Sequence, residues 1–113
     1  MVEGSQIDWG GHSNLAWYIV DEMLDFDKSI GQVLKFAAKD GETLVIITAD
    51  HETGGFSLAE GDLSTGAIGG SFTSINHTGV MVPVFAFGPG AEDFMGIYEN
   101  TEIFYKMVKA LGL

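Results

Sequence analysis

A near-continuous run of apolar and β-branched residues, Thr43–Ala49, constrains the fold of this chain more than any other feature. Such a run is typical of a strand buried on both faces, as in a parallel sheet covered by helices. It follows a long stretch, 13–40, in which apolar residues recur at helical spacing. The members of this stripe are Ala16, Ile19, Val20, Met23, Phe26, Ile30, Val33, Leu34 and Ala37. We therefore expect a long helix followed by a buried strand.

The rest of the chain continues this pattern. The stretch 54–79 is rich in Gly, Ser and Thr, and it predicts an extended loop with room for a short hairpin around Phe72. A second strand is expected at 80–87. A C-terminal helix is expected at about 100–111, with Ile103, Phe104, Met107, Val108 and Leu111 as its buried stripe. The order of helix, strand, loop, strand and helix indicates the α/β class, and we expect residues 1–113 to form a single α/β domain.

Composition excludes several classes of site and partner. The chain has no cysteine, which excludes disulfide scaffolds, thiolate nucleophiles and cysteine zinc sites. Its net charge of −11 argues against a nucleic-acid partner, because phosphate backbones need a basic face. No apolar run approaches the roughly 20 residues of a membrane span, so we expect no membrane partner. The acidity leaves two interpretations: a solvated acidic surface for most carboxylates, or cation ligands for a few.

All three histidines lie beside loop or turn signals. His12 follows two glycines, His51 follows Asp50 at the end of the first predicted strand, and His77 precedes the second. In open α/β sheets, ligands bind outside the carboxyl ends of the strands, which is where Asp50 and His51 stand. A turn-capping Asp beside an exposed His explains this dipeptide about equally well.

Asp8 and His12 form a second candidate pair, four residues apart. The two intervening glycines let this expected loop fold back, so that carboxylate and imidazole converge. Oxygen and nitrogen ligands without sulfur fit a catalytic zinc better than a structural one. Glu3 is a carboxylate of the kind that suits magnesium, and a plain surface charge is the alternative.

Three segments of the chain resemble segments of alkaline phosphatases and occur in that family's order. They are Met1–His12, Thr48–Gly55 and His77–Gly79, the last followed by Val82-Pro83-Val84. The resemblance spans essentially the whole chain but only the C-terminal portion of a longer enzyme. It implies that this chain is a fragment of a three-layer α/β/α sandwich.

The resemblance also implies that the site holds two zinc ions and one magnesium ion, and it implies which residues bind them. In that assignment Glu3 is a magnesium ligand, Asp8, His12 and His77 hold the first zinc, and Asp50 and His51 help hold the second. The implied activity is hydrolysis of phosphate monoesters. The implied location is periplasmic or secreted, and the implied assembly is a homodimer.

Two catalytic groups of the family have no counterpart in this sequence. The nucleophilic serine lies on an earlier stretch of the family's sequence, and the phosphate-clamping arginine is missing because the chain contains no Arg. We therefore expect no catalytic residue within this chain and no activity of the chain in isolation. Three alternatives stay open: a non-catalytic zinc-binding α/β module, another hydrolase of the superfamily such as a sulfatase or phosphodiesterase, and an α/β interaction domain with incidental histidines.

Overall fold

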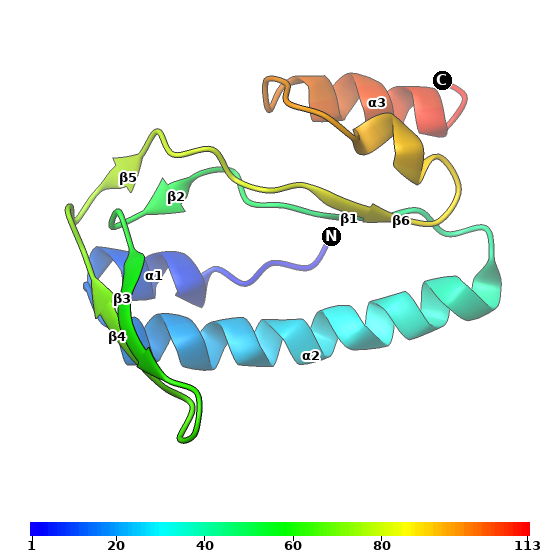
Figure 1. Ribbon diagram of the computed structural model, residues 1–113. Helices are drawn as coiled ribbons and strands as arrows, with labels where there is room; N and C mark the ends of the chain where they lie inside the picture. Colours follow the sequence, from blue (N-terminus) through cyan, green and yellow to red (C-terminus); the bar gives the residue numbers. More distant parts are fainter. The chain divides into compact units, whose positions relative to one another are not determined.

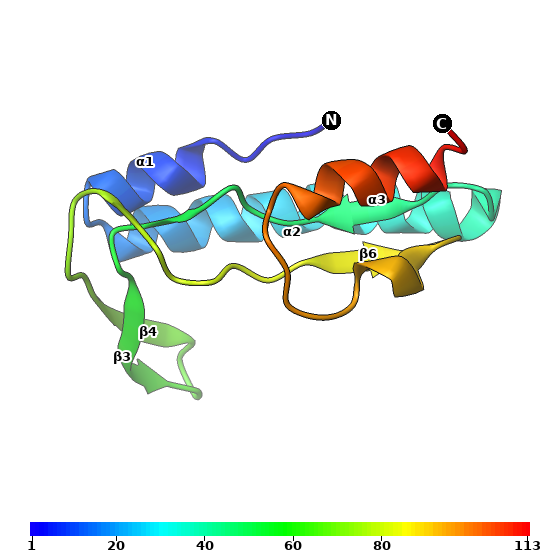
Figure 2. The same cartoon turned by 90° about the horizontal axis from the view of Figure 1, so that it is seen from above.

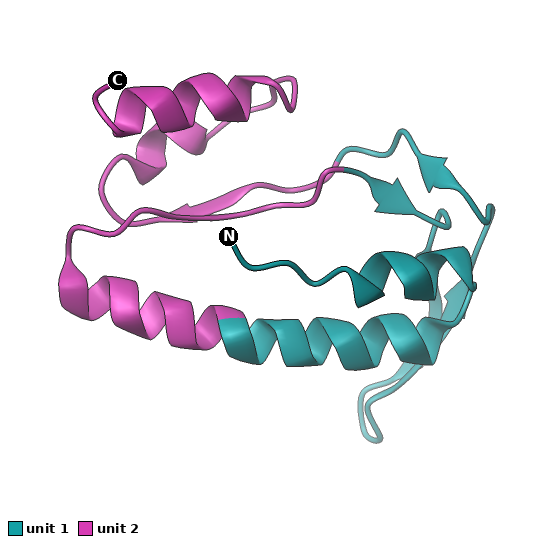
Figure 3. Cartoon of the chain, turned by 180° about the vertical axis from the view of Figure 1, so that it is seen from behind, with its two compact units in different colours: residues 1–29, 51–81 teal, residues 30–50, 82–113 magenta.

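The computed structural model describes all residues, 1–113, in two compact units (Figure 3). Unit 1 comprises residues 1–29 and 51–81, and unit 2 comprises residues 30–50 and 82–113. The chain is of the α/β class, with its elements in the following order (Figure 1): α1 (Gln6–His12), α2 (Ala16–Asp40), β1 (Val45–Ile47), β2 (Glu52–Thr53), β3 (Ser57–Asp62), β4 (Ala67–Ser71), β5 (His77–Thr78), β6 (Phe85–Phe87), the 3-10 helix η1 (Ala91–Phe94) and α3 (Glu102–Ala110).

The predicted long helix is confirmed as α2. It ends at Gly41, whose φ of 76° places it in the left-handed region and whose N–H donates to the Ala37 carbonyl at 2.9 Å. Within the predicted stripe, Ile19 and Ala37 are buried, whereas Met23 is 51% exposed. Neither α2 nor any other helix combines the length and the apolar character needed to cross a membrane.

In unit 2, the two predicted strands pair with each other. The registers of β1 and β6 are Val45↔Phe87, Ile46↔Ala86 and Ile47↔Phe85. The pairing is antiparallel, so the expected parallel sheet is wrong for these strands, and Val45 is the one buried residue of the two. Both strands are shorter than predicted. β6 begins after Pro83, which has no N–H to donate to a ladder.

The C-terminal helix is confirmed as α3, but its predicted burial is wrong. Phe104 is 59% exposed and Leu111 is 73% exposed, and α3 has no buried residue. Within unit 2, α3 packs against η1, a single helical turn whose Phe94 is buried. An amphipathic stripe is buried only where a second surface of comparable size faces it, and η1 is too short to cover this one.

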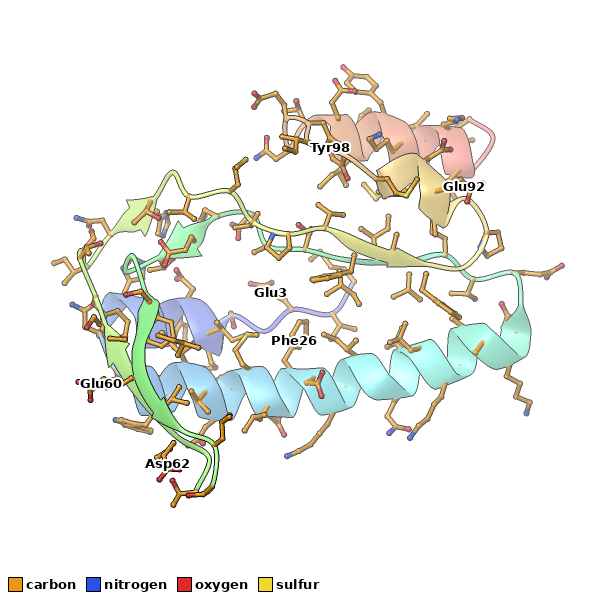
Figure 4. The ribbon with its side chains drawn as sticks, in the orientation of Figure 1. Glu3, Phe26, Glu60, Asp62, Glu92 and Tyr98 are labelled. Atoms are coloured by element: carbon orange, nitrogen blue, oxygen red, sulfur yellow. The ribbon has the colours of Figure 1, made fainter.

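In unit 1, the loop expected at 54–79 contains the β3–β4 hairpin and the strand β5. The β3–β4 hairpin points away from α1 (Figure 2), and every residue of β3 is exposed. Asp62 lies at the turn of the hairpin (Figure 4), where one carboxylate oxygen accepts hydrogen bonds from the Ser64 N–H at 2.8 Å and the Ser64 hydroxyl at 2.6 Å. Strand β5, at the end of the stretch, pairs with β2, which lies directly before the stretch. The expectation of an extended loop is therefore wrong for the paired residues, whereas the expected hairpin is present, although it precedes Phe72.

Candidate metal centre

Asp8 and His12 lie on one helix, α1. Residues four apart on a helix share a face, and His12 Nε2 stands 3.5 Å from Asp8 Oδ1. The expectation that a folded-back loop brings them together is therefore wrong, because helical geometry does so.

The two glycines of α1 permit close packing instead of a bend. A Cβ built on Gly11 would lie 2.7 Å from the carbonyl oxygen of Thr53, and one on Gly10 would lie 3.0 Å from Cγ1 of Ile19. Both glycines are buried. The absence of a side chain at these positions lets α1 approach β2 and the start of α2.

Strand β5 brings His77 to the face of α1 that carries Asp8 and His12. In the β2–β5 ladder His77 lies opposite Thr53. His77 Nε2 is 3.6 Å from Asp8 Oδ1 and 3.2 Å from His12 Nε2. The three ligand atoms all lie within 4.8 Å of one another, although His77 is 65 residues from His12 along the chain. Asp8 is half-buried, and the two histidines are exposed.

The three donor atoms fit a zinc ion. Bonds of about 2.0–2.1 Å in a tetrahedron place two ligand atoms about 3.3 Å apart, and the three separations observed here are 3.2, 3.5 and 3.6 Å. Two imidazole nitrogens and one carboxylate oxygen form a donor set that zinc favours over magnesium. Three protein ligands also leave a coordination position for water or substrate, as in catalytic zinc sites.

The ring of His12 is oriented by a main-chain carbonyl. His12 Nδ1 lies 2.6 Å from the carbonyl oxygen of Ile75, which can only accept. Nδ1 therefore carries the hydrogen, and Nε2 presents its lone pair toward Asp8 and His77. Because Ile75 is two residues before His77, one short segment positions both rings.

His51 lies against the same cluster. Its ring stacks on that of His77, with the centroids 3.5 Å apart and the planes 20° from parallel. Thr53 connects it to Asp8: the Thr53 hydroxyl donates to Asp8 Oδ1 at 2.5 Å and lies 3.3 Å from His51 Nδ1. Unit 1 thus brings together four of the six residues predicted from the sequence to bind metal.

The remaining two predicted ligands, Glu3 and Asp50, are not among the three residues whose ligand atoms converge. Glu3 is exposed on the segment that precedes α1 (Figure 4). Asp50 is exposed and belongs to unit 2, directly before His51 in the chain.

Sequence reasoning assigned no role to Glu52 or Thr53. The Glu52 carboxylate accepts hydrogen bonds from the N–H groups of Gly55 and Phe56, both at 3.0 Å, and from the Thr78 hydroxyl. Burial alone would raise the pKa of the Glu52 carboxyl, but these hydrogen bonds and the charge of His51 outweigh it and hold the pKa below its ordinary value.

Glu52 therefore ties the turn after β2 to β5. The two-residue period of a strand distinguishes the roles of Glu52 and Thr53. Residues 51 and 53 share one face of the strand, and residue 52 lies on the other.

Comparison with known proteins identifies the family. The family model described as alkaline phosphatase matches residues 1–71 and 66–113. Alkaline phosphatase from the Antarctic bacterium TAB5 is 56% identical in sequence, with a TM-score of 0.87 over 96% of this chain and 33% of that one. A mutant of the TAB5 enzyme, with Mg bound in the M3 site, is 53% identical, with a TM-score of 0.87 over 96% of this chain and 34% of that one.

A curated relative agrees. Alkaline phosphatase of Escherichia coli strain K12 is 34% identical over 128 aligned residues, which cover 99% of this chain and 27% of the relative. The chain spans 27% to 34% of the length of these three proteins. The family match along the whole sequence and these likenesses show that the chain belongs to the alkaline phosphatase family.

Proposed function

We propose that this chain provides the metal-holding part of an enzyme that hydrolyses phosphate monoesters. The observation that carries the proposal is the convergence of Asp8, His12 and His77, with all three ligand atoms within 4.8 Å of one another. A donor set of this kind, partly exposed to solvent, is the kind of site at which a phosphate ester can reach a bound ion.

In this proposal each ion has its own ligands from the chain. Asp8, His12 and His77 hold a first zinc ion. Asp50 and His51 help hold a second, and Glu3 is a ligand of one magnesium ion. Membership of the family and the donor chemistry of these side chains support the assignment.

The ions, when bound, supply Lewis acidity toward the phosphoryl group and the attacking oxygen. The protein's part is orientation. The Ile75 carbonyl holds the His12 ring with Nε2 toward the cluster, and the half-buried Asp8 places its negative charge beside both imidazoles. The side chains of His12 and His77 are 40% and 51% exposed, which leaves the substrate side of the cluster open.

The chain lacks the groups that would complete turnover. It contains no Arg to clamp the phosphate. The resemblance to the family implies that the nucleophilic serine has no counterpart here either. We propose that other residues of the complete enzyme supply both, and that the isolated 113 residues bind zinc without hydrolysing the ester. For the complete enzyme, family membership supports a homodimer and a periplasmic or secreted location.

Zinc titration of the purified chain tests the metal assignment. Saturating zinc at about 100 times its Kd should stabilise the fold by about 2.7 kcal/mol, seen as a higher melting temperature. His12→Ala and Asp8→Asn should abolish this effect. Asp25→Asn is the matched control, because Asp25 is an exposed carboxylate of α2 paired with Lys28. A zinc response that survives His12→Ala contradicts the assignment.

A phosphate-binding measurement distinguishes a part of a phosphatase from a non-catalytic zinc-binding module. The absence of Arg is the observation that favours the module. Inorganic phosphate should further stabilise the zinc-loaded chain and leave the zinc-free chain unchanged. A preference for sulfate indicates a sulfatase, and no anion effect favours the non-catalytic module. Chelator-sensitive hydrolysis of a chromogenic phosphomonoester by the isolated chain contradicts the proposal that its nucleophile lies elsewhere.

A further inference from the structure

We propose that Thr53 is a positioning residue whose hydroxyl joins Asp8 to His51 and fixes the His51 ring in the tautomer that offers Nε2 to a metal ion. The inference rests on the proposed function, in which Asp8 and His51 are metal ligands. The hydrogen bonds that carry it are properties of the chain alone.

The backbone of Thr53 is held from two sides. On one side it pairs with His77 in the β2–β5 ladder. On the other, its carbonyl oxygen would lie 2.7 Å from a Cβ on Gly11, so α1 packs directly against it. Gly54 then ends the strand with a φ of 93°, a conformation that residues with side chains rarely adopt. The hydroxyl of Thr53 is therefore presented from a fixed point between α1 and β5.

The hydrogens of this contact can be assigned. A threonine hydroxyl has one hydrogen, and an ionised carboxylate can only accept. The 2.5 Å contact with Asp8 Oδ1 takes that hydrogen, so the Thr53 oxygen can offer only a lone pair to His51 Nδ1 at 3.3 Å. Nδ1 is then the protonated nitrogen of the neutral ring, and Nε2 is the nitrogen with the metal-binding lone pair.

The same hydroxyl touches ligands assigned to both zinc ions. Asp8 Oδ1, which accepts from Thr53, is also the atom that faces Nε2 of His12 and Nε2 of His77. The ring of His51 stacks on that of His77. Loss of the hydroxyl should therefore weaken both sites together, whereas loss of the Ile75 contact acts on the His12 ring alone.

Three substitutions in the 113-residue chain test the role. Thr53→Val removes the hydroxyl and nearly keeps the shape, and Thr53→Ser keeps the hydroxyl. Thr78→Val is the matched control: Thr78 lies in the same ladder and its hydroxyl also donates to a carboxylate, that of Glu52, which is not assigned to a metal. Circular dichroism checks that each variant folds.

Two measurements are made on each folded variant. Ring nitrogen shifts of His51 in the metal-free chain, at a pH where imidazole is neutral, report the tautomer. Competition with a chelator reports the zinc Kd. We expect the Nδ1–H tautomer in the original chain, in Thr53→Ser and in Thr78→Val, and its loss in Thr53→Val. We expect Thr53→Val to raise the zinc Kd about 10- to 100-fold and the other two to leave it near the original value.

The role is overturned if Thr53→Val leaves either the ring shifts or the zinc Kd unchanged, or if Thr53→Ser is as weak as Thr53→Val. If the original chain binds no zinc, the proposed function fails. The ring shifts then still decide whether Thr53 sets the His51 tautomer.

Discussion

Replacing Gly11 and Gly31 by Ala makes the same chemical change in two helices with opposite steric results. A methyl group on Gly31, in α2, meets no heavy atom within 4 Å. One on Gly11, in α1, would lie 2.7 Å from the Thr53 carbonyl oxygen and 2.9 Å from Thr53 Cβ. The first contact partner is backbone, so β2 or α1 must move.

The expected magnitudes follow from two effects. Glycine in a helix costs up to about 1 kcal/mol relative to alanine, so Gly31→Ala should raise the free energy of unfolding by about that amount. Gly11→Ala gains at most the same and loses about 1–3 kcal/mol to overpacking. The propensity gain is common to both variants, so their difference isolates the steric cost of about 1–3 kcal/mol. For 113 residues this corresponds to about 4–12 °C in melting temperature.

The assay is thermal and urea unfolding of the two variants side by side, followed by zinc titration. Gly11→Ala should also weaken zinc binding, because α1 carries Asp8 and His12 while β2 carries Thr53. Gly31→Ala should leave zinc binding unchanged. Equal melting temperatures for the two variants would refute the close packing of α1 on β2.

Three further predictions concern charged groups outside the three-ligand cluster. Glu52→Gln should lower the free energy of unfolding by about 1–2 kcal/mol, because one amide oxygen replaces two carboxylate oxygens that accept three hydrogen bonds. Folding lowers the pKa of Glu52, so the stabilisation by its carboxylate is full above the unfolded value of 4.5 and is lost as pH falls through the lower folded value. The difference in unfolding free energy between the original chain and Glu52→Gln, measured by urea titration, should therefore disappear in acid. A difference that stays constant with pH contradicts this. Hydrogen bonds from Ser64 likewise hold the pKa of the Asp62 carboxyl below its ordinary value of 3.8. Asp62→Ala should therefore speed amide exchange in the β3–β4 hairpin at neutral pH and leave zinc binding unchanged. Unchanged exchange would show that the turn does not depend on this carboxylate. Lys109→Ala removes an ion pair with Asp93, in which the nitrogen and oxygen are 2.8 Å apart and the Lys side chain is 70% exposed. The free energy of unfolding, measured with denaturant, should fall by less than about 1 kcal/mol. A larger fall would mean that α3 depends on this contact.

Periodicity predicted the helices with the strongest repeats. The apolar stripe of α2 extends over more than six turns, and Gly41 provides a stop with a physical cause, so both features are readable without the structure. The three motifs likewise carried the family assignment. The grouping of Asp8, His12 and His77 in one site was implied by that resemblance, because no local pattern relates residues 12 and 77.

Other features depended on tertiary contacts. Two glycines in a row disfavour a helix by propensity. Both are needed for tertiary packing, because Ile19 and Thr53 occupy the space that side chains at these positions would fill. A short hairpin was expected around Phe72, but the strands β3 and β4, which precede Phe72, were not predicted because they carry glycine and polar residues in place of β-branched alternation. The exposure of α3 was missed because periodicity shows which face is apolar and does not show whether anything covers it.

The closed base of the β3–β4 hairpin makes it a tolerant place to lengthen the chain. Two main-chain hydrogen bonds of 3.0 Å connect the segments before and after this hairpin, next to the β2–β5 ladder. The Gly54 N–H donates to the Asn76 carbonyl, and the Thr73 N–H donates to the Gly54 carbonyl. Doubling the length of a flexible loop that is closed by such hydrogen bonds lowers the free energy of unfolding by only about 0.6 kcal/mol. A reporter peptide or a small folded tag can therefore replace the turn between Asp62 and Gly66, which makes this hairpin a graft site for following the metal cluster by fluorescence.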